Sequence, residues 1–191
     1  MKKQITLAAV ALAISLTPTM AEDMKALAME GKGVIKAFGG ALKHELVTAM
    51  KAGGPKNAVG VCNIKAPEIA TKVSADKGWT IARSSHKLRN PDNKADDFTR
   101  KTIEEFLDRQ EKGEKAADMV KVAIVEEGGK KIFRMVKAIP TGEVCLKCHG
   151  GKEVMPETEA VLKEHYPQDK ARGFMVGQMR GVFTLQKVLS Q

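Results

Sequence analysis

Large aromatic side chains are scarce in this sequence of 191 residues, which contains 6 Phe, 1 Trp and 1 Tyr. Cysteine is scarcer still, with 3 residues. The sequence also contains 17 Gly and 7 Pro. So little glycine and proline excludes a collagen-like or low-complexity chain, while 43% hydrophobic residues suffice for a folded core. The length corresponds to a single domain.

A second hydrophobic run long enough to span a membrane is also missing. Near the start, two lysines precede an uncharged, mostly apolar run over residues 5–16, and Thr19 and Ala21 supply small residues before a cleavage site. The run is well short of the ~20 residues that span a bilayer. We therefore predict that residues 1–21 are a secretory signal peptide, cleaved after Ala21. Residues 22–191 would then be a periplasmic domain with no stable membrane anchor.

The net charge of +9 does not by itself indicate a nucleic-acid-binding protein. The lysines are dispersed among acidic residues, and the few aromatic residues form no series on which bases could stack. An exported protein also rarely meets nucleic acid. The charge instead favours an acidic protein partner, attracted by electrostatic steering.

Hydrophobic periodicity predicts helices and strands in one mixed domain. Gly53-Gly54 would end the first helix, and Pro67 would bend the second. The hairpin connection favours an antiparallel sheet, and helices grouped beside such a sheet form an α+β fold. The predicted elements are a helix over 23–51, a helix from Pro55 to Val73, a strand over 79–83, a helix over 97–112, a hairpin of 120–125 with 132–139, a short helix over 157–165 and a strand over 181–185.

Residues 145–149 have the sequence Cys-Leu-Lys-Cys-His, the C-x-x-C-H motif of c-type haem attachment. Two thiols three residues apart lie on one side of a helical turn, so Cys145 and Cys148 can form thioethers with two vinyl groups on one porphyrin edge. His149 then supplies an axial nitrogen to the iron. The motif and the predicted export together indicate one covalently attached haem c.

Three other interpretations of this motif are weaker. A thioredoxin-like C-x-x-C would begin a helix after the first strand of a βαβ unit, and that context is missing. A zinc site needs a second pair of ligands, and only one further cysteine exists. A disulfide between Cys145 and Cys148 leaves His149 unexplained.

The third cysteine, Cys62, falls on the apolar stripe of the second predicted helix. It is either a buried, inert thiol or the second axial ligand of the haem iron, because a thiolate is a strong, soft donor. Spacing alone leaves four competing donors, which are Met175, Met179, His86 and His165.

Several blocks of the sequence resemble those of a single-haem c-type family with a PAS-like fold, long catalogued as a domain of unknown function. These blocks are Val61 to Ala70, Arg89 to Asn93, Cys145 to Gly150, Tyr166 to Ala171 and Met179 to Phe183. The resemblance implies that His149 and Cys62 are the two axial ligands. It also implies a PAS-like core over residues 77–191, preceded by N-terminal helices over 23–76.

Two arginines near these blocks are candidates for contacts with the haem propionates. Guanidinium groups suit carboxylates, so Arg83 and Arg89 could serve this purpose. Arg89 could equally brace its own loop.

The favoured function is electron transfer, with both axial positions filled and a redox partner protein docked on the basic surface. A haem-based sensor of redox state or of a small gas is the first alternative, and it would need a separate output partner. A haem enzyme of sulfur or peroxide chemistry is the second, although no convincing distal acid–base pair is evident. Whether the chain forms a homodimer is left open.

Overall fold

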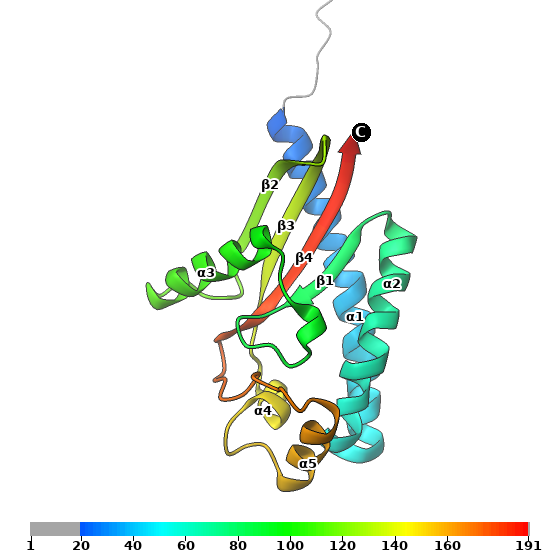
Figure 1. Ribbon diagram of the computed structural model, residues 1–191, viewed down its shortest axis with the longest axis vertical. Coiled ribbons are helices and arrows are strands. Elements are labelled where there is room, and N and C mark those ends of the chain that lie inside the picture. The colour runs from blue at the N-terminus through cyan, green and yellow to red at the C-terminus, as the bar shows by residue number, and fades with distance from the viewer. Residues whose placement is uncertain (1–19, 191) are drawn as a thin grey trace, which may run out of the picture.

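The computed structural model describes residues 20–190 (Figure 1). The predicted signal peptide lies outside the described residues, except for Met20 and Ala21, which begin the first helix. Within the described part of the chain, no helix is both long and apolar enough to cross a bilayer.

Four strands form one sheet with the order β1-β4-β3-β2, and every neighbouring pair is antiparallel. The strands are β1 (Thr80–Ser84), β2 (Val120–Glu127), β3 (Lys130–Pro140) and β4 (Met179–Ser190). The hairpin turn between β2 and β3 is made by Gly128 and Gly129, whose φ angles of 59° and 76° favour glycine. The α+β class with an antiparallel sheet is thus confirmed, and the arrangement is consistent with a PAS-like fold.

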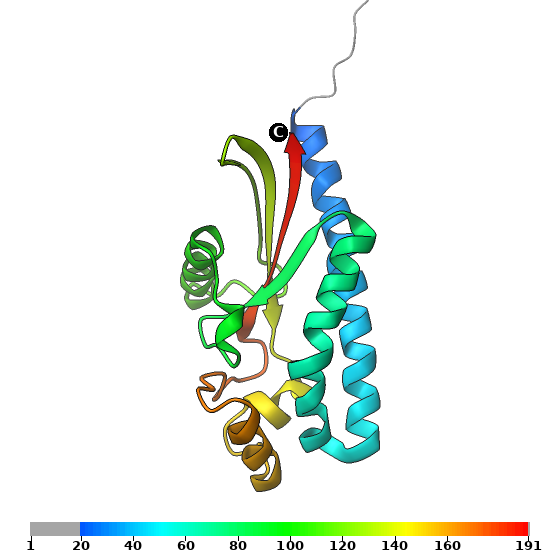
Figure 2. The same ribbon diagram turned by 45° about the vertical axis from the view of Figure 1, so that its right-hand side comes forward.

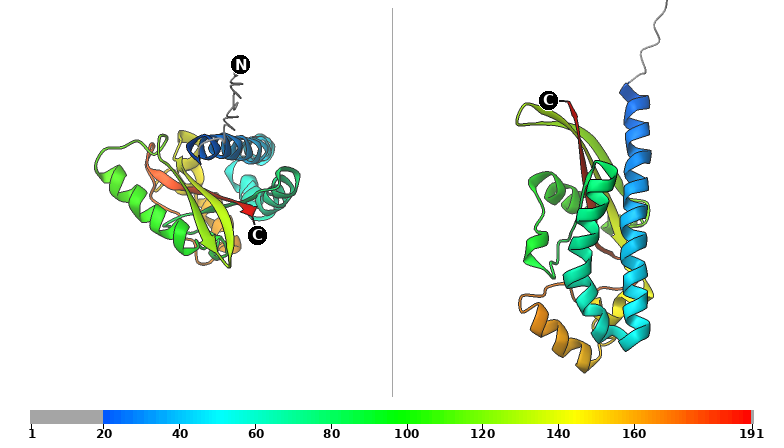
Figure 3. Two further views of the ribbon diagram at one scale, coloured as in Figure 1. Left: turned by 90° about the horizontal axis from the view of Figure 1, so that it is seen from above. Right: turned by 90° about the vertical axis from the view of Figure 1, so that its right-hand side faces the viewer.

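Helices cover both faces of this sheet (Figure 2). The helices are α1 (Met20–Gly60), α2 (Ala66–Lys77), α3 (Asp97–Glu111), α4 (Glu143–His149) and α5 (Pro156–His165). The first two lie on one face and α3 on the other, while α4 and α5 lie beyond one end of the sheet (Figure 3). The sheet therefore has one apolar core on each face.

The core on the α1 side contains half of the large aromatic residues, namely Phe38, Trp79, Phe133 and Phe183. Trp79 and Phe133 meet edge to face with ring centroids 5.7 Å apart, and Phe38 meets Phe183 in the same way at 5.8 Å. Glu30 of α1 accepts hydrogen bonds from the Trp79 indole and from Lys187, both at 2.7 Å. These two ring pairs and the Glu30 contacts join α1 to the sheet.

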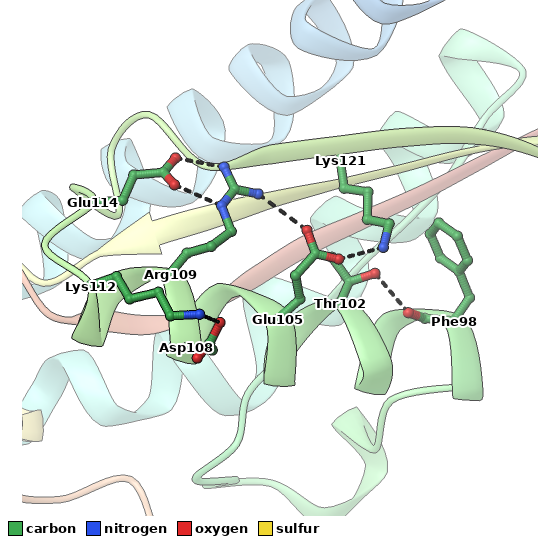
Figure 4. A network of polar contacts seen from close by, with 8 residues as sticks. All are labelled: Phe98, Thr102, Glu105, Asp108, Arg109, Lys112, Glu114 and Lys121. Carbon is green, nitrogen blue, oxygen red and sulfur yellow. Dashed lines mark hydrogen bonds and ion pairs between the residues drawn. The ribbon is translucent and has the colours of Figure 1, made fainter.

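Helix α3 begins at an N-cap formed by Asp96, whose carboxylate accepts a hydrogen bond from the Thr99 amide at 2.7 Å. Its outer face carries a network of ion pairs (Figure 4). Arg109 contacts Glu114 and Glu105, and Glu105 also binds Lys121 of β2. Of these contacts, the pair between Glu105 and Lys121 joins α3 to the sheet, on the side away from α1.

The predicted break after the first helix is confirmed. The helical assignment continues to Gly60, but Gly53 and Gly54 have non-helical backbone angles, and the φ of 70° at Gly54 favours glycine. A π-helix over Val61–Lys65 follows, and α2 starts with Pro67 in its first turn. The bend that we predicted at Pro67 therefore occurs slightly earlier, as a π-helix that contains Cys62.

Several predicted elements are longer in the structure, including both strands of the hairpin, and β4 differs most. The first helix begins at Met20 instead of residue 23, and β4 extends from Met179 to Ser190 instead of covering 181–185. The sequence pattern did not predict the C-terminal part of β4, because the polar residues Gln186 and Lys187 interrupt the apolar alternation. They belong to the strand because it pairs with β1 on one side and β3 on the other.

Candidate functional site

The C-x-x-C-H motif forms the short helix α4, directly after the end of β3. Gly142 precedes the helix with extended backbone, and its N–H donates to the Cys145 sulfur at 3.4 Å. One helical turn separates Cys145 from Cys148, so both thiols lie on one side of the helix. The helix thus presents two thiols and an imidazole from a single turn.

Helix α4 forms one wall of a cavity at the end of the sheet. The cavity is lined by all six residues that we predicted to attach, ligate or contact a haem: Cys62, Arg83, Arg89, Cys145, Cys148 and His149. Its empty space is about 1150 Å³ when the open mouth is included.

The walls of the cavity differ in polarity. Helix α1 and the residues after its break contribute an apolar wall, formed by Leu42, Leu46, Met50, Ala58 and Val59. The segment after β1 contributes polar and basic groups, among them Ser85, Lys87 and Asn90. The cavity therefore suits a largely apolar group with acidic substituents.

The imidazole of His149 has a defined tautomer. Its Nδ1 lies 3.0 Å from the carbonyl oxygen of Ala171, which can only accept, so the ring donates from Nδ1. Burial lowers the pKa of His149 well below its usual value, and the nearby Arg89 and Arg180 add to the effect. A neutral ring whose Nδ1–H binds a carbonyl is the usual state of a metal-ligating histidine, since Nε2 keeps its lone pair.

Cys62 reaches the cavity from the π-helix. There the Ala66 N–H binds the carbonyl of Val61, five residues back, in place of the α-helical partner. The Cys62 side chain is partly buried, and none of the three cysteines forms a disulfide. Among residues 20–190, no cluster of three His, Cys, Asp or Glu side chains could hold a metal ion, so no zinc site is evident there.

The four competing donors from the sequence do not line the cavity. Met179 is 1% exposed and belongs to the core on the α3 side, and Met175 is 63% exposed. His86 packs against Phe174, and the Nδ1 of His165 lies 3.5 Å from the Asn63 side chain. A different methionine, Met50, does line the cavity; we did not predict it, because it continues the apolar stripe of α1 without a break.

Arg89 is engaged in a network of polar contacts. Its Nε donates to Asp169 at 3.1 Å, and one of its terminal nitrogens donates to the carbonyl oxygen of Cys148. Arg172 donates to the same carbonyl oxygen at 3.1 Å and pairs with Asp169 and Glu159. These contacts fix the C-terminal end of α4 and match the expected loop-bracing role, although Arg89 also lines the cavity.

Arg83 has no such partner. Its guanidinium lies over the Phe38 ring, 5.7 Å from the centroid, and burial lowers its pKa. No carboxylate within the described span forms an ion pair with it. It remains a candidate for binding an acidic group in the cavity.

Two further cavity residues were not predicted as site residues. Arg180 at the start of β4 and Tyr166 after α5 both line the cavity. Burial raises the pKa of Tyr166 to about 12, with a contribution from nearby Cys62. Neither residue stands in a local motif. The one signal in the sequence that could have indicated a site role is that both lie in blocks that resemble the family.

Comparisons with known proteins agree with this fold. A family model described as Tll0287-like matches residues 2–187. The fold resembles the crystal structure of the cyanobacterial haem protein Tll0287, with a TM-score of 0.61 and 21% sequence identity. That match covers 91% of this chain and 99% of the other. No curated protein matches the chain.

Proposed function

The chain belongs to the Tll0287-like family, and we propose that it is a periplasmic c-type cytochrome that transfers electrons through one covalently attached haem. The solved relative is a haem protein. The observation that carries the proposal is the convergence of Cys62 with Cys145, Cys148 and His149 on one cavity.

The residues present fit a haem c. Cys145 and Cys148 would hold the porphyrin edge, and His149, with its Nδ1–H bound to Ala171, offers Nε2 to the iron. When bound, the haem supplies an iron that cycles between ferric and ferrous states. The apolar wall from α1 would keep water from its face, and Arg83 is available for a propionate.

Cys62 is proposed as the second axial ligand, since it is the one cysteine left after two thioethers form and it shares the cavity with His149. With both axial positions filled by the protein, a substrate could not reach the iron without displacing a ligand. This favours electron transfer over catalysis. The mature chain, without Lys2 and Lys3, would carry a net charge of +7, which favours docking of an acidic redox partner through electrostatic attraction.

The experiment that tests the proposal compares wild type with Cys62→Ser in the ferric state, by absorption and electron spin resonance. We expect wild type to be six-coordinate and low-spin, and Cys62→Ser to lose that signature. We also expect a low reduction potential in wild type, because anionic sulfur stabilises ferric iron. Met175→Ala is the matched control, since that exposed sulfur lies outside the cavity. An unchanged spectrum in Cys62→Ser, or a pyridine haemochrome assay without covalent haem, would contradict the proposal.

A second candidate function is a sensor in which a small gas displaces Cys62. The π-helix favours it, because such helices often occur at functional sites, where the backbone can rearrange. Addition of carbon monoxide to the reduced protein distinguishes the two functions. Ready displacement supports sensing, and an unchanged spectrum supports electron transfer.

A further inference from the structure

Strand β2 forms one edge of the sheet and has a strand neighbour, β3, on one side only (Figure 1). It is 8 residues long with the sequence VKVAIVEE, and most of these residues are apolar and β-branched. A long, apolar edge strand is a site at which another strand can pair. Whether this edge is free depends on its backbone groups.

The pairing of β2 with β3 shows which backbone groups of β2 point outward. The Ala138 N–H donates to the Met119 carbonyl oxygen at 3.1 Å, and from there the register continues without a shift to Glu127. Hydrogen-bonded pairs alternate along an antiparallel ladder, so the odd-numbered residues of β2 bind β3. The N–H and C=O groups of Val122, Ile124 and Glu126 therefore point away from the sheet. Within the described residues, no loop or side chain hydrogen-bonds to these groups.

The opposite edge of the sheet is closed in a different way. Strand β1 is 5 residues long, and the N–H of its Ile81 donates to the Ser74 hydroxyl of α2 at 3.1 Å. Helix α2 thus covers this edge and occupies an outward backbone group. The edge at β2 has no such cover, so its backbone groups are available to a further strand.

The charges on β2 make the strand complementary to itself. Lys121 lies near its start, and Glu126 and Glu127 lie at its end. Lys121 pairs with Glu105 of α3 (Figure 4), and Glu127 pairs with Arg134, yet their side chains remain 37% and 49% exposed. Charges on an edge strand usually discourage pairing. Here the two ends carry opposite signs, so two copies of β2 that run antiparallel attract each other.

We propose that two copies of this chain dimerise by antiparallel pairing of their β2 strands about a two-fold axis, which joins the two sheets into one. Outward residues must pair with outward residues, so the register shifts only in steps of two residues. One register places Lys121 opposite Glu127 of the second copy at both ends of the pairing, with Ile124 at the two-fold axis. The partner is thus a second copy of this chain, and the inference does not rest on the proposed function.

The charge pairs select this register from its neighbours. Lys121 and Glu127 of the second copy would form non-hydrogen-bonded pairs, in which opposing side chains approach most closely. A shift of two residues in either direction would place Lys121 opposite Val125 or Gly129, which have no charge. Parallel pairing would instead bring like charges side by side.

Analytical ultracentrifugation of the haem-loaded protein over a series of concentrations tests the proposal. We expect wild type to show a monomer–dimer equilibrium. In Glu126→Pro, the dissociation constant should rise at least about tenfold, because proline removes an outward N–H that the contact with β3 does not use. Glu126→Gln is the matched control, since it removes the same charge but keeps the N–H, and it should change the dissociation constant less than about twofold. Circular dichroism of each variant checks that the fold is retained.

A charge exchange tests the register. Lys121→Glu places like charges at both ends of the pairing and should raise the dissociation constant at least about tenfold. Lys112→Glu is its matched control, because it makes the same change of charge at a 72% exposed side chain of α3. A mixture of Lys121→Glu with Glu127→Lys should form a heterodimer, because every charge then meets one of opposite sign.

Amide hydrogen exchange carries the test if Glu127→Lys does not fold, since its partner Arg134 is buried. The amides of Val122 and Ile124 should exchange more slowly as the concentration of wild type rises. In Glu126→Pro their exchange should not depend on concentration.

Two results would overturn the proposal. One is a wild type that stays monomeric at every concentration, which would leave the edge to a strand of a different protein. The other is a dimer that persists in both Glu126→Pro and Lys121→Glu, because it would use another face. Neither result bears on the proposed function, which depends on the spectra of the haem.

Discussion

His149 and Ala171 are joined by a 3.0 Å hydrogen bond from the imidazole Nδ1–H to the backbone carbonyl. The segment that carries Ala171 is tied to the end of α4 a second time, because the Phe174 N–H donates to the His149 carbonyl oxygen at 3.0 Å. Ring and backbone of this histidine are thus held by one short segment. Such an outer hydrogen bond fixes the tautomer and orientation of a ligating histidine.

A His149→Gly variant should retain covalent haem through Cys145 and Cys148 but lose the low-spin ferric spectrum. Added imidazole should restore that spectrum, because the vacated space can accept a free ring. Wild type treated with the same imidazole is the control, and its spectrum should not change. A variant that is low-spin without imidazole would show that His149 is not an axial ligand.

An Asp169→Asn variant should destabilise the fold by about 3 kcal/mol, because it removes the negative partner of two arginines at a buried site. The Asp169 side chain is 8% exposed and that of Arg89 is 10% exposed. Denaturant unfolding followed by circular dichroism measures the change. Glu68→Gln is the matched control, since its pair with Lys65 is mostly exposed and its loss should change stability much less than the loss of Asp169. Equal losses in the two variants would contradict the bracing role.

A Gly181→Ala variant should destabilise the protein by about 1–3 kcal/mol, because its Cβ would lie 2.4 Å from a backbone oxygen of Ser84. The clash would separate β1 from β4 next to the cavity. Gly33→Ala in α1 is the control, since its Cβ would meet no atom within 4 Å and alanine favours a helix by up to about 1 kcal/mol. Thermal unfolding of both variants gives the comparison, and a stable Gly181→Ala would disprove the close approach.

An Asp96→Asn variant should change how stability depends on pH. Burial raises the pKa of Asp96, but hydrogen bonds from Thr99 and Arg134 outweigh it, so the pKa lies below its ordinary value of 3.8. A lowered pKa in the folded state contributes stability above 3.8, and this contribution is lost as the pH falls through the folded value.

Denaturant titrations of wild type and Asp96→Asn at neutral pH and at successively lower pH check this expectation. Wild type should lose more stability than the variant below pH 3.8, because asparagine keeps the N-cap acceptor but has no charge to lose. Parallel curves for the two proteins would count against an ionised Asp96 paired with Arg134.

The sequence predicted most of this fold because its signals are local. Periodicity located the helices and the hairpin, and the glycine pair Gly53-Gly54 marked the break in α1. Cys145, Cys148 and His149 are adjacent in one motif, and Cys62 followed from the odd cysteine count and the family resemblance. Their roles as ligands stay predictions.

Tertiary packing decided what the sequence did not reveal. Arg180 and Met50 reach the cavity from β4 and α1, and neither stands in a local motif that signals a site. The partners of Arg89 lie far along the chain, at Cys148 and Asp169. The sequence pattern around Arg89 therefore could not decide between a propionate contact and a loop-bracing role. The full length of β4 depended on pairing with two other strands.

The cavity is lined by residues from Leu42 in α1 to Arg180 in β4. Any unfolding event that detaches either end of the domain must therefore open it. A chromophore held there would report on the integrity of the elements that line the cavity, which are α1, the π-helix, β1, the end of β3, α4 and the start of β4. Its absorption and the loss of backbone structure should then coincide along an unfolding curve.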